Sequence, residues 1–184
     1  MIIELKTPIT NEQIERLRIG DTVSITGIIY TARDAAHKKL VEAIKKGEQL
    51  PFDPNNAIIY YVGPTPAKPN QVIGSAGPTS SYRMDPYSSI LMEKGVKITI
   101  GKGPRSEQFK KDLIKYKGVY LSAIGGAGAL ISKAIKKAEL IAYPELGPEA
   151  IYKLEVENFT CFVTYDSKGN DLLTQGIMQY SNRK

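Results

Sequence analysis

Cysteine is scarce in this chain, and Cys161 is the only one among 184 residues. A single cysteine excludes an internal disulfide and any multi-cysteine metal cluster held by this chain alone, and it fits a reducing cytoplasm. Long apolar runs are also missing, since none approaches the roughly 20 residues that a membrane-spanning helix needs. Residues 1–6 lack a basic segment followed by a long apolar one, so we expect no signal peptide.

Internal repeats and low-complexity tracts are absent too, and 42% hydrophobic with 24% charged residues is the composition of a globular domain. The formal net charge of +6 suggests an anionic partner. Most lysines, however, come in pairs on predicted helices, which is typical of a solvated face, and aromatic residues are not interleaved with them. We therefore favour a small anionic substrate or an acidic partner subunit over nucleic acid or a membrane surface.

The hydrophobic periodicity predicts a mixed order of helices and strands. A capping box at Thr10–Gln13 opens the first helix, and Gly47 ends the second. The predicted helices cover residues 10–18, 33–46, 86–94, 106–116 and 127–138. The predicted strands cover residues 21–30, 57–62, 96–100, 119–124, 140–143, 152–156 and 161–165, the last two as a pair joined to a turn at 166–170. Crossovers and hairpins together indicate a layered α/β domain.

Arg33 and His37 lie four residues apart at a predicted helix start, so they share a face. The positive end of the helix dipole favours an anion there, and Arg33 either projects into such a site or forms a surface salt bridge with Asp34 or Glu42. His37 is the only histidine. We favour a hydrogen-bonded support over a catalytic base for it.

A long Gly- and Pro-rich loop spans residues 63–81, and loops of this length in compact domains are usually functional. Its segment 74–81 is either an anion cradle, in which glycines allow backbone amides and hydroxyls to point inward, or an ordinary turn. Arg83 just downstream favours the site. Two arginine forks, Arg33 and Arg83, would suit a small dicarboxylate.

Three other features have simpler interpretations. Residues 101–104 form a β-to-α turn that frees Lys102, and their spacing does not match a phosphate loop. Residues 125–129 resemble a dinucleotide fingerprint only weakly, so we interpret them as a close-packed turn that offers amides to an anion. Cys161 alternates with apolar residues and is expected to be buried.

Several stretches, in this order, resemble the β subunit of the class I, iron–sulfur fumarate hydratases and of the related L-tartrate dehydratases. Two of them, 29–37 and 74–85, are long and unusual; the others are 20–21, 100–103, 125–126 and 146–150. The match runs from residue 20 to about 166, and it does not separate the two substrates. One departure is Tyr82, which either narrows the site or points away.

The resemblance implies one swivelling β/β/α domain of the fumarase/aconitase type over residues 1–184, with its core at about 20–166. It also implies a hetero-oligomer with a separate α subunit that supplies three cysteines to a [4Fe–4S] cluster. In isolation, the chain would form a homodimer. This chain would then bind no metal and would be active only with that α subunit.

The resemblance assigns roles to four residues: Arg33, Arg83 and Lys102 would bind the substrate carboxylates, and Thr79 would be the base at C3, its alkoxide stabilised by Arg83 and Lys102. To these we add Ser80 as a substrate-binding residue and His37 and Asp34 as supports. The open iron of the cluster would act as a Lewis acid on the C2 hydroxyl. The expected function is fumarate hydration to (S)-malate, with L(+)-tartrate dehydration or non-catalytic carboxylate binding as alternatives.

Overall fold

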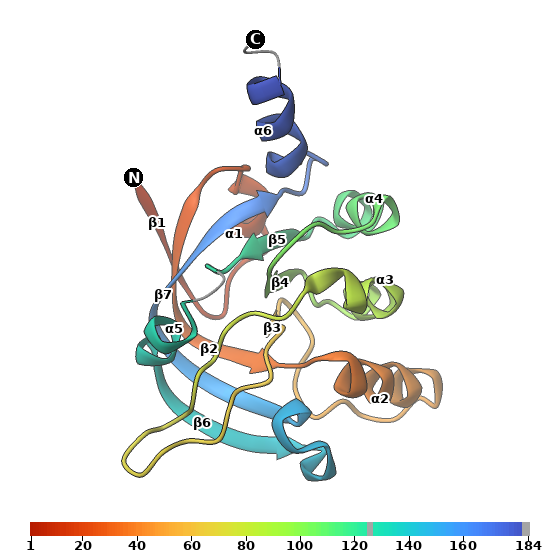
Figure 1. Cartoon of the computed structure of the whole chain (residues 1–184). Helices are drawn as coiled ribbons and strands as arrows, with labels where there is room; N and C mark the ends of the chain where they lie inside the picture. Colours follow the sequence, from red (N-terminus) through yellow and green to blue (C-terminus); the bar gives the residue numbers. More distant parts are fainter. Residues whose placement is uncertain (125–126, 182–184) are drawn as a thin grey trace.

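The computed structural model describes residues 1–124 and 127–181. Within these residues the strands form one sheet in the order β1-β2-β3-β4-β5-β7-β6 (Figure 1). The strands are β1 (Ile2–Lys6), β2 (Thr22–Thr31), β3 (Ile58–Tyr60), β4 (Ile98–Gly101), β5 (Val119–Ser122), β6 (Ile135–Ala142) and β7 (Ile151–Tyr165). The helices are α1 (Asn11–Arg16), α2 (Asp34–Lys45), α3 (Asp85–Glu93), α4 (Glu107–Tyr116), α5 (Gly128–Ala134) and α6 (Leu172–Ser181), with short 3-10 helices η1 (Ser81–Met84) and η2 (Pro144–Glu149).

The sheet has a parallel part and an antiparallel part. Strands β1 to β5 pair in parallel in chain order, and helices α1, α2, α3 and α4 lie in the crossovers that connect them. Strand β7 runs antiparallel to β2, β5 and β6. Since β7 pairs with both β2 and β5, the pairings β2-β3-β4-β5-β7 close on themselves. The predicted α/β class, with both crossovers and hairpins, is confirmed.

Side chains of the parallel strands alternate between two cores, as a strand period of two requires. In β3, Ile58 and Tyr60 belong to the larger core, which also contains buried side chains of β2 and β7. Their neighbours Ile59 and Tyr61 face a second core with residues of α2 and α3. The domain is therefore layered: antiparallel strands, parallel strands, then helices.

Helices α2, α3 and α4 lie side by side along one flank of the parallel strands (Figure 1). Their starts follow the sequence: Ser106 caps α4 by accepting a hydrogen bond from the Phe109 amide at 3.1 Å, and Thr10 forms the predicted capping box of α1. Lys46 and Gly47 end α2, where Gly47 has φ of 70°. No helix among the described residues is long and apolar enough to cross a membrane.

Two predictions about the last third are wrong. The helix predicted over 127–138 ends at Ala134, because the residues from Ile135 onward pair with β7. The two strands predicted at 152–156 and 161–165 are one strand, β7, which pairs with β2 on both sides of a β-bulge at its middle. The turn at 166–170 is present, held by the Asp166 carboxylate, which accepts hydrogen bonds from the Lys168 and Asn170 amides, but it leads to α6. Strand β1 and helix α6 were not predicted.

Candidate functional site

The carboxyl ends of the parallel strands meet at one edge of the sheet. The register aligns Thr31 of β2 with Tyr60 of β3, and Tyr60 with Ile100 of β4. The segments that leave these strands therefore start side by side, and they carry Arg33, the 63–80 loop and Lys102. Ligands of open α/β sheets bind at this edge. We call it the carboxyl edge.

Arg33 leaves β2 and stands at the N-cap of α2 with an extended backbone. Its side chain packs on Gly63, where an added Cβ would lie 2.7 Å from Nη1, so a larger residue there would displace the guanidinium. Its Nε lies 3.5 Å from Oε1 of Glu149. The salt bridge suggested by the sequence, with Asp34 or Glu42, is thus replaced by one with Glu149 on η2.

Arg83 on η1 meets Asp34, the residue next to Arg33. Its Nε donates to Oδ1 at 3.1 Å and its Nη2 lies 2.9 Å from Oδ2, the two-point geometry of an arginine fork. The Arg83 side chain is nevertheless 42% exposed. The contact with Asp34 therefore brings the Arg83 side chain to the start of α2, where the chain passes directly from Arg33 to Asp34.

Backbone contacts hold the loop segment that carries Thr79. Its amide donates to the Tyr61 carbonyl at 2.7 Å, just beyond β3. Three residues earlier, the Ala76 carbonyl accepts a 2.5 Å hydrogen bond from the buried Tyr60 hydroxyl. The Thr79 side chain is half-buried. Because these contacts use its backbone, the position of Thr79 does not depend on its hydroxyl.

Ser80 and Ser81 connect this loop to the end of β4. Ser80 forms a parallel bridge with Lys102. The Ser81 amide donates to the Lys102 carbonyl at 3.0 Å, and the Lys102 amide donates to Ser81 Oγ at 3.0 Å. The Lys102 side chain is exposed, whereas Ser81 is fully buried. Ser81 therefore ties Lys102 to the loop, a role that the sequence analysis missed because serines are ordinary in turns.

His37 is fully buried behind Arg33. Its Nδ1 lies 2.8 Å from the Arg33 carbonyl, which also accepts the His37 amide at 2.9 Å. Burial lowers the pKa of His37 to about 4, so the ring is neutral at pH 7 and Nδ1 is the protonated donor. Among the described residues His37 Nε2 has no hydrogen-bond partner. This is the geometry of a support for the Arg33 backbone.

The remaining sequence features lie around the loop. Gly125 and Gly126 lie outside the described residues, but Gly128 of the same motif packs against Gly77, and its carbonyl accepts the Ala76 amide at 3.2 Å. Tyr82 is 62% exposed.

The single cysteine of the chain does not lie at the carboxyl edge. Cys161 is fully buried in β7, and burial raises the pKa of its thiol. Within residues 1–124 and 127–181, no three His, Cys, Asp or Glu side chains gather as metal ligands would. The described residues therefore do not fit an iron–sulfur cluster.

Fold and site together define an α/β domain that presents arginine, lysine and hydroxyl groups at the carboxyl ends of parallel strands, an arrangement suited to a small anion. The Fumarase C-terminus family model matches residues 1–176. The chain belongs to this family.

Its relatives fall into two groups. It is 43% identical over 176 residues to a "Putative fumarate hydratase class I" of Geobacillus stearothermophilus and 42% identical over 165 residues to the anaerobic class I fumarate hydratase of Escherichia coli. The matches cover 93% and 89% of this chain but only 33% and 30% of those proteins. It is also 41% identical to a "Putative L(+)-tartrate dehydratase subunit beta" of Methanocaldococcus jannaschii, with 89% of this chain and 87% of that protein covered.

Proposed function

We propose that this chain is the substrate-binding β subunit of a two-subunit class I fumarate hydratase, which interconverts fumarate and (S)-malate. The grouping of Arg33, Arg83 and Lys102 at the carboxyl edge carries the proposal. Arginine forks match carboxylates in two-point geometry, and the lysine adds a third cation. The names and identities of the fumarate hydratase relatives support this choice.

Each residue has a proposed role. Arg33 and Arg83 bind one carboxylate each, Lys102 adds a third positive charge, and Ser80 donates a hydrogen bond. Thr79 Oγ1 removes the C3 proton of malate and returns it during hydration. A threonine hydroxyl is a poor base unaided, so the positive charges of Arg83 and Lys102 must stabilise its alkoxide.

A partner subunit completes the proposal. The family resemblance implies a [4Fe–4S] cluster, and a separate α subunit would hold it, since the described residues here do not fit one. The tartrate dehydratase relative supports this, because it is named as a β subunit and matches this chain over most of its length. The layered sheet is compatible with a swivelling β/β/α domain that closes over such a partner in the cytoplasm.

L(+)-tartrate dehydration is the second candidate. One observation favours it: the chain covers 87% of a tartrate dehydratase β subunit but about a third of the fumarate hydratases. The chemistry would be the same on a substrate with one more hydroxyl. A non-catalytic carboxylate-binding domain remains the alternative from another class.

The test is reconstitution. The chain is co-expressed under anaerobic conditions with a candidate α subunit, and the complex is assayed with malate, fumarate and L(+)-tartrate. We expect turnover of malate and fumarate by the complex and none by either subunit alone. Turnover of tartrate alone selects the second candidate. Dicarboxylate binding without turnover selects the binding domain, and dehydration of malate by the chain alone contradicts the two-subunit proposal.

A further inference from the structure

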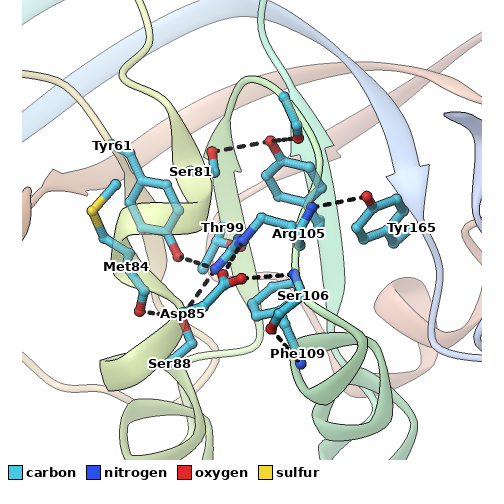
Figure 2. A network of polar contacts seen from close by, with 12 residues as sticks. Tyr61, Ser81, Met84, Asp85, Ser88, Thr99, Arg105, Ser106, Phe109 and Tyr165 are labelled. Atoms are coloured by element: carbon cyan, nitrogen blue, oxygen red, sulfur yellow. Dashed lines mark hydrogen bonds and ion pairs between the residues drawn. The ribbon is translucent and has the colours of Figure 1, made fainter.

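A buried arginine lies beneath the carboxyl edge. The Arg105 side chain is 0% exposed, and its Nε donates to Oδ1 of Asp85 at 2.5 Å (Figure 2). Its Nη2 donates to Ser88 Oγ at 3.0 Å. The guanidinium carbon stands 3.4 Å from the centre of the Phe109 ring, a cation–π contact. A buried charge with this many partners is held in one position.

Asp85 uses its second oxygen as well. Oδ2 accepts the Ser106 amide at 2.7 Å, at the N-cap of α4. The Arg105 amide in turn donates to the Tyr165 hydroxyl at 2.9 Å. The pair therefore connects the start of α3 to the start of α4, and the Arg105 backbone is anchored to β7.

The two connected segments are those that carry the candidate site cations. Asp85 lies two residues after Arg83, and Arg105 lies three residues after Lys102. A second connection lies closer to the edge, where Ser81 Oγ accepts the Lys102 amide and stands 3.0 Å from the Tyr120 hydroxyl. The η1 segment and the segment after β4 are thus joined twice, and Figure 2 shows the Arg105–Asp85 connection.

We infer that the Arg105–Asp85 pair is a positioning pair that sets the spacing between Arg83 and Lys102. Neither side chain of the pair is exposed enough to bind substrate, since Arg105 is 0% and Asp85 11% exposed. The inference that this spacing serves a dicarboxylate rests on the proposed function. The spacing itself is a property of the chain and can be measured without activity.

The experiment compares the full chain with two variants. The first variant, Arg105→Lys, keeps the positive charge but loses the separate guanidinium donors to Asp85 and Ser88. The second is the double variant Arg105→Gln/Asp85→Asn, which removes both charges, so that no buried charge is left unpaired. The control is Lys117→Gln, which breaks the ion pair between Lys117 at the C-cap of α4 and Glu15 on α1. Amide hydrogen exchange is measured at Ser81 and Lys102 and along the β2–β7 ladder.

We expect exchange at Ser81 and Lys102 to accelerate at least roughly tenfold in both variants, with the β2–β7 amides unchanged in them and all these amides unchanged in the Lys117→Gln control. In the reconstituted complex, KM for malate should rise about tenfold, while kcat changes less than about threefold, and Arg105→Lys should be the milder variant. Unchanged exchange at the two amides, or equal acceleration along the whole ladder, overturns the inference. Absence of turnover in the unmodified complex overturns the proposed function instead, and exchange still decides the positioning.

Discussion

Two arginine–aspartate pairs in this domain differ in their access to water. In the Arg83–Asp34 pair the side chains are 42% and 29% exposed, whereas in the Arg105–Asp85 pair they are 0% and 11% exposed. An exposed ion pair typically contributes about 0–1 kcal/mol, whereas breaking a buried pair on one side costs about 3–5 kcal/mol. The same two residue types therefore suit a reachable binding group in one place and a fixed support in the other.

This contrast separates binding from stability. A substrate carboxylate can reach the exposed Arg83 guanidinium and compete with or join Asp34. The buried Arg105 guanidinium is already saturated by Asp85, Ser88 and the ring of Phe109. Changes at the carboxyl edge should thus alter turnover and KM with little effect on stability, whereas changes beneath it should lower the free energy of unfolding and reach KM only through the positions of Arg83 and Lys102.

The largest effect is expected for Thr79→Val, on the exposed side of this comparison. The variant keeps the side-chain shape and the amide contact with the Tyr61 carbonyl but removes the hydroxyl. Proton transfer should slow by about 10²–10⁴-fold, with KM and the free energy of unfolding nearly unchanged. Steady-state kinetics and solvent-hydrogen exchange into malate C3 measure this. If exchange continues at the unmodified rate, the base is Ser80 or a group of the partner subunit, since His37 is fully buried.

Arg105→Met should give the largest loss of stability. It leaves the Asp85 carboxylate without its guanidinium partner, so the free energy of unfolding should fall by about 3–5 kcal/mol in urea denaturation. Adding Asp85→Asn should recover part of the loss, because the unpaired charge is then gone. A loss below about 1 kcal/mol would mean that the buried pair contributes no more to the free energy of unfolding than the exposed Arg83–Asp34 pair.

The sequence predicted the elements whose pattern is local. Alternation in 21–30 and the helical face of 33–46 identified β2 and α2, because each buries one side. The sequence analysis divided strand β7 in two because Glu157 and Asn158 interrupt its apolar pattern; they are exposed at a β-bulge, and pairing with β2 resumes at Phe159 and continues to Phe162. Whether these residues form one strand or two depends on the partner strands, which are distant in sequence.

The candidate site residues were likewise predicted where the pattern is local and missed where the fold brings distant residues together. Arg33, Thr79, Arg83 and Lys102 were identified from loop composition and family resemblance, and the register of β2, β3 and β4 brings their segments together. Glu149 and Arg105 were missed as site neighbours. Arg105 follows a Gly- and Pro-rich turn with no periodic signal, and its burial comes from Asp85 and Phe109, which are brought to it by the fold.

Arg83→Ala should affect binding and turnover together. A charge-assisted hydrogen bond to a carboxylate contributes about 1.5–3 kcal/mol, so KM should rise roughly tenfold or more. Since Arg83 also stabilises the Thr79 alkoxide in our proposal, kcat should fall too. Steady-state kinetics of the reconstituted complex checks both, and unchanged unfolding in urea is the control. An unchanged KM would remove Arg83 from the carboxylate site.

A pH effect is expected from His37, which lies between the two regions. Burial lowers its pKa to about 4 from the ordinary 6.5, so the unfolded chain binds the proton first as pH falls. The stabilisation by neutral His37 is complete above pH 6.5 and is lost progressively toward pH 4. Between pH 7 and 4.5 the loss should be about 2 kcal/mol. His37→Asn, which retains a donor for the Arg33 carbonyl, should lose about 2 kcal/mol less over that range in urea denaturation; equal losses would contradict the assignment.

The smallest effect is expected for Asp34→Asn, which tests the exposed pair directly. The variant keeps the side-chain shape, but it removes the charge that meets Arg83 and favours the first turn of α2. The free energy of unfolding should change by about 1 kcal/mol or less, and added salt should shrink the difference. KM for malate should rise only about two- to fivefold, because Arg83 remains available and loses only its orientation. Lys39→Gln, which breaks the exposed pair with Glu145, is the matched control for stability. If Asp34→Asn costs as much stability as Arg105→Met, exposure does not distinguish the two pairs, and Asp34 belongs to the support rather than to the binding surface.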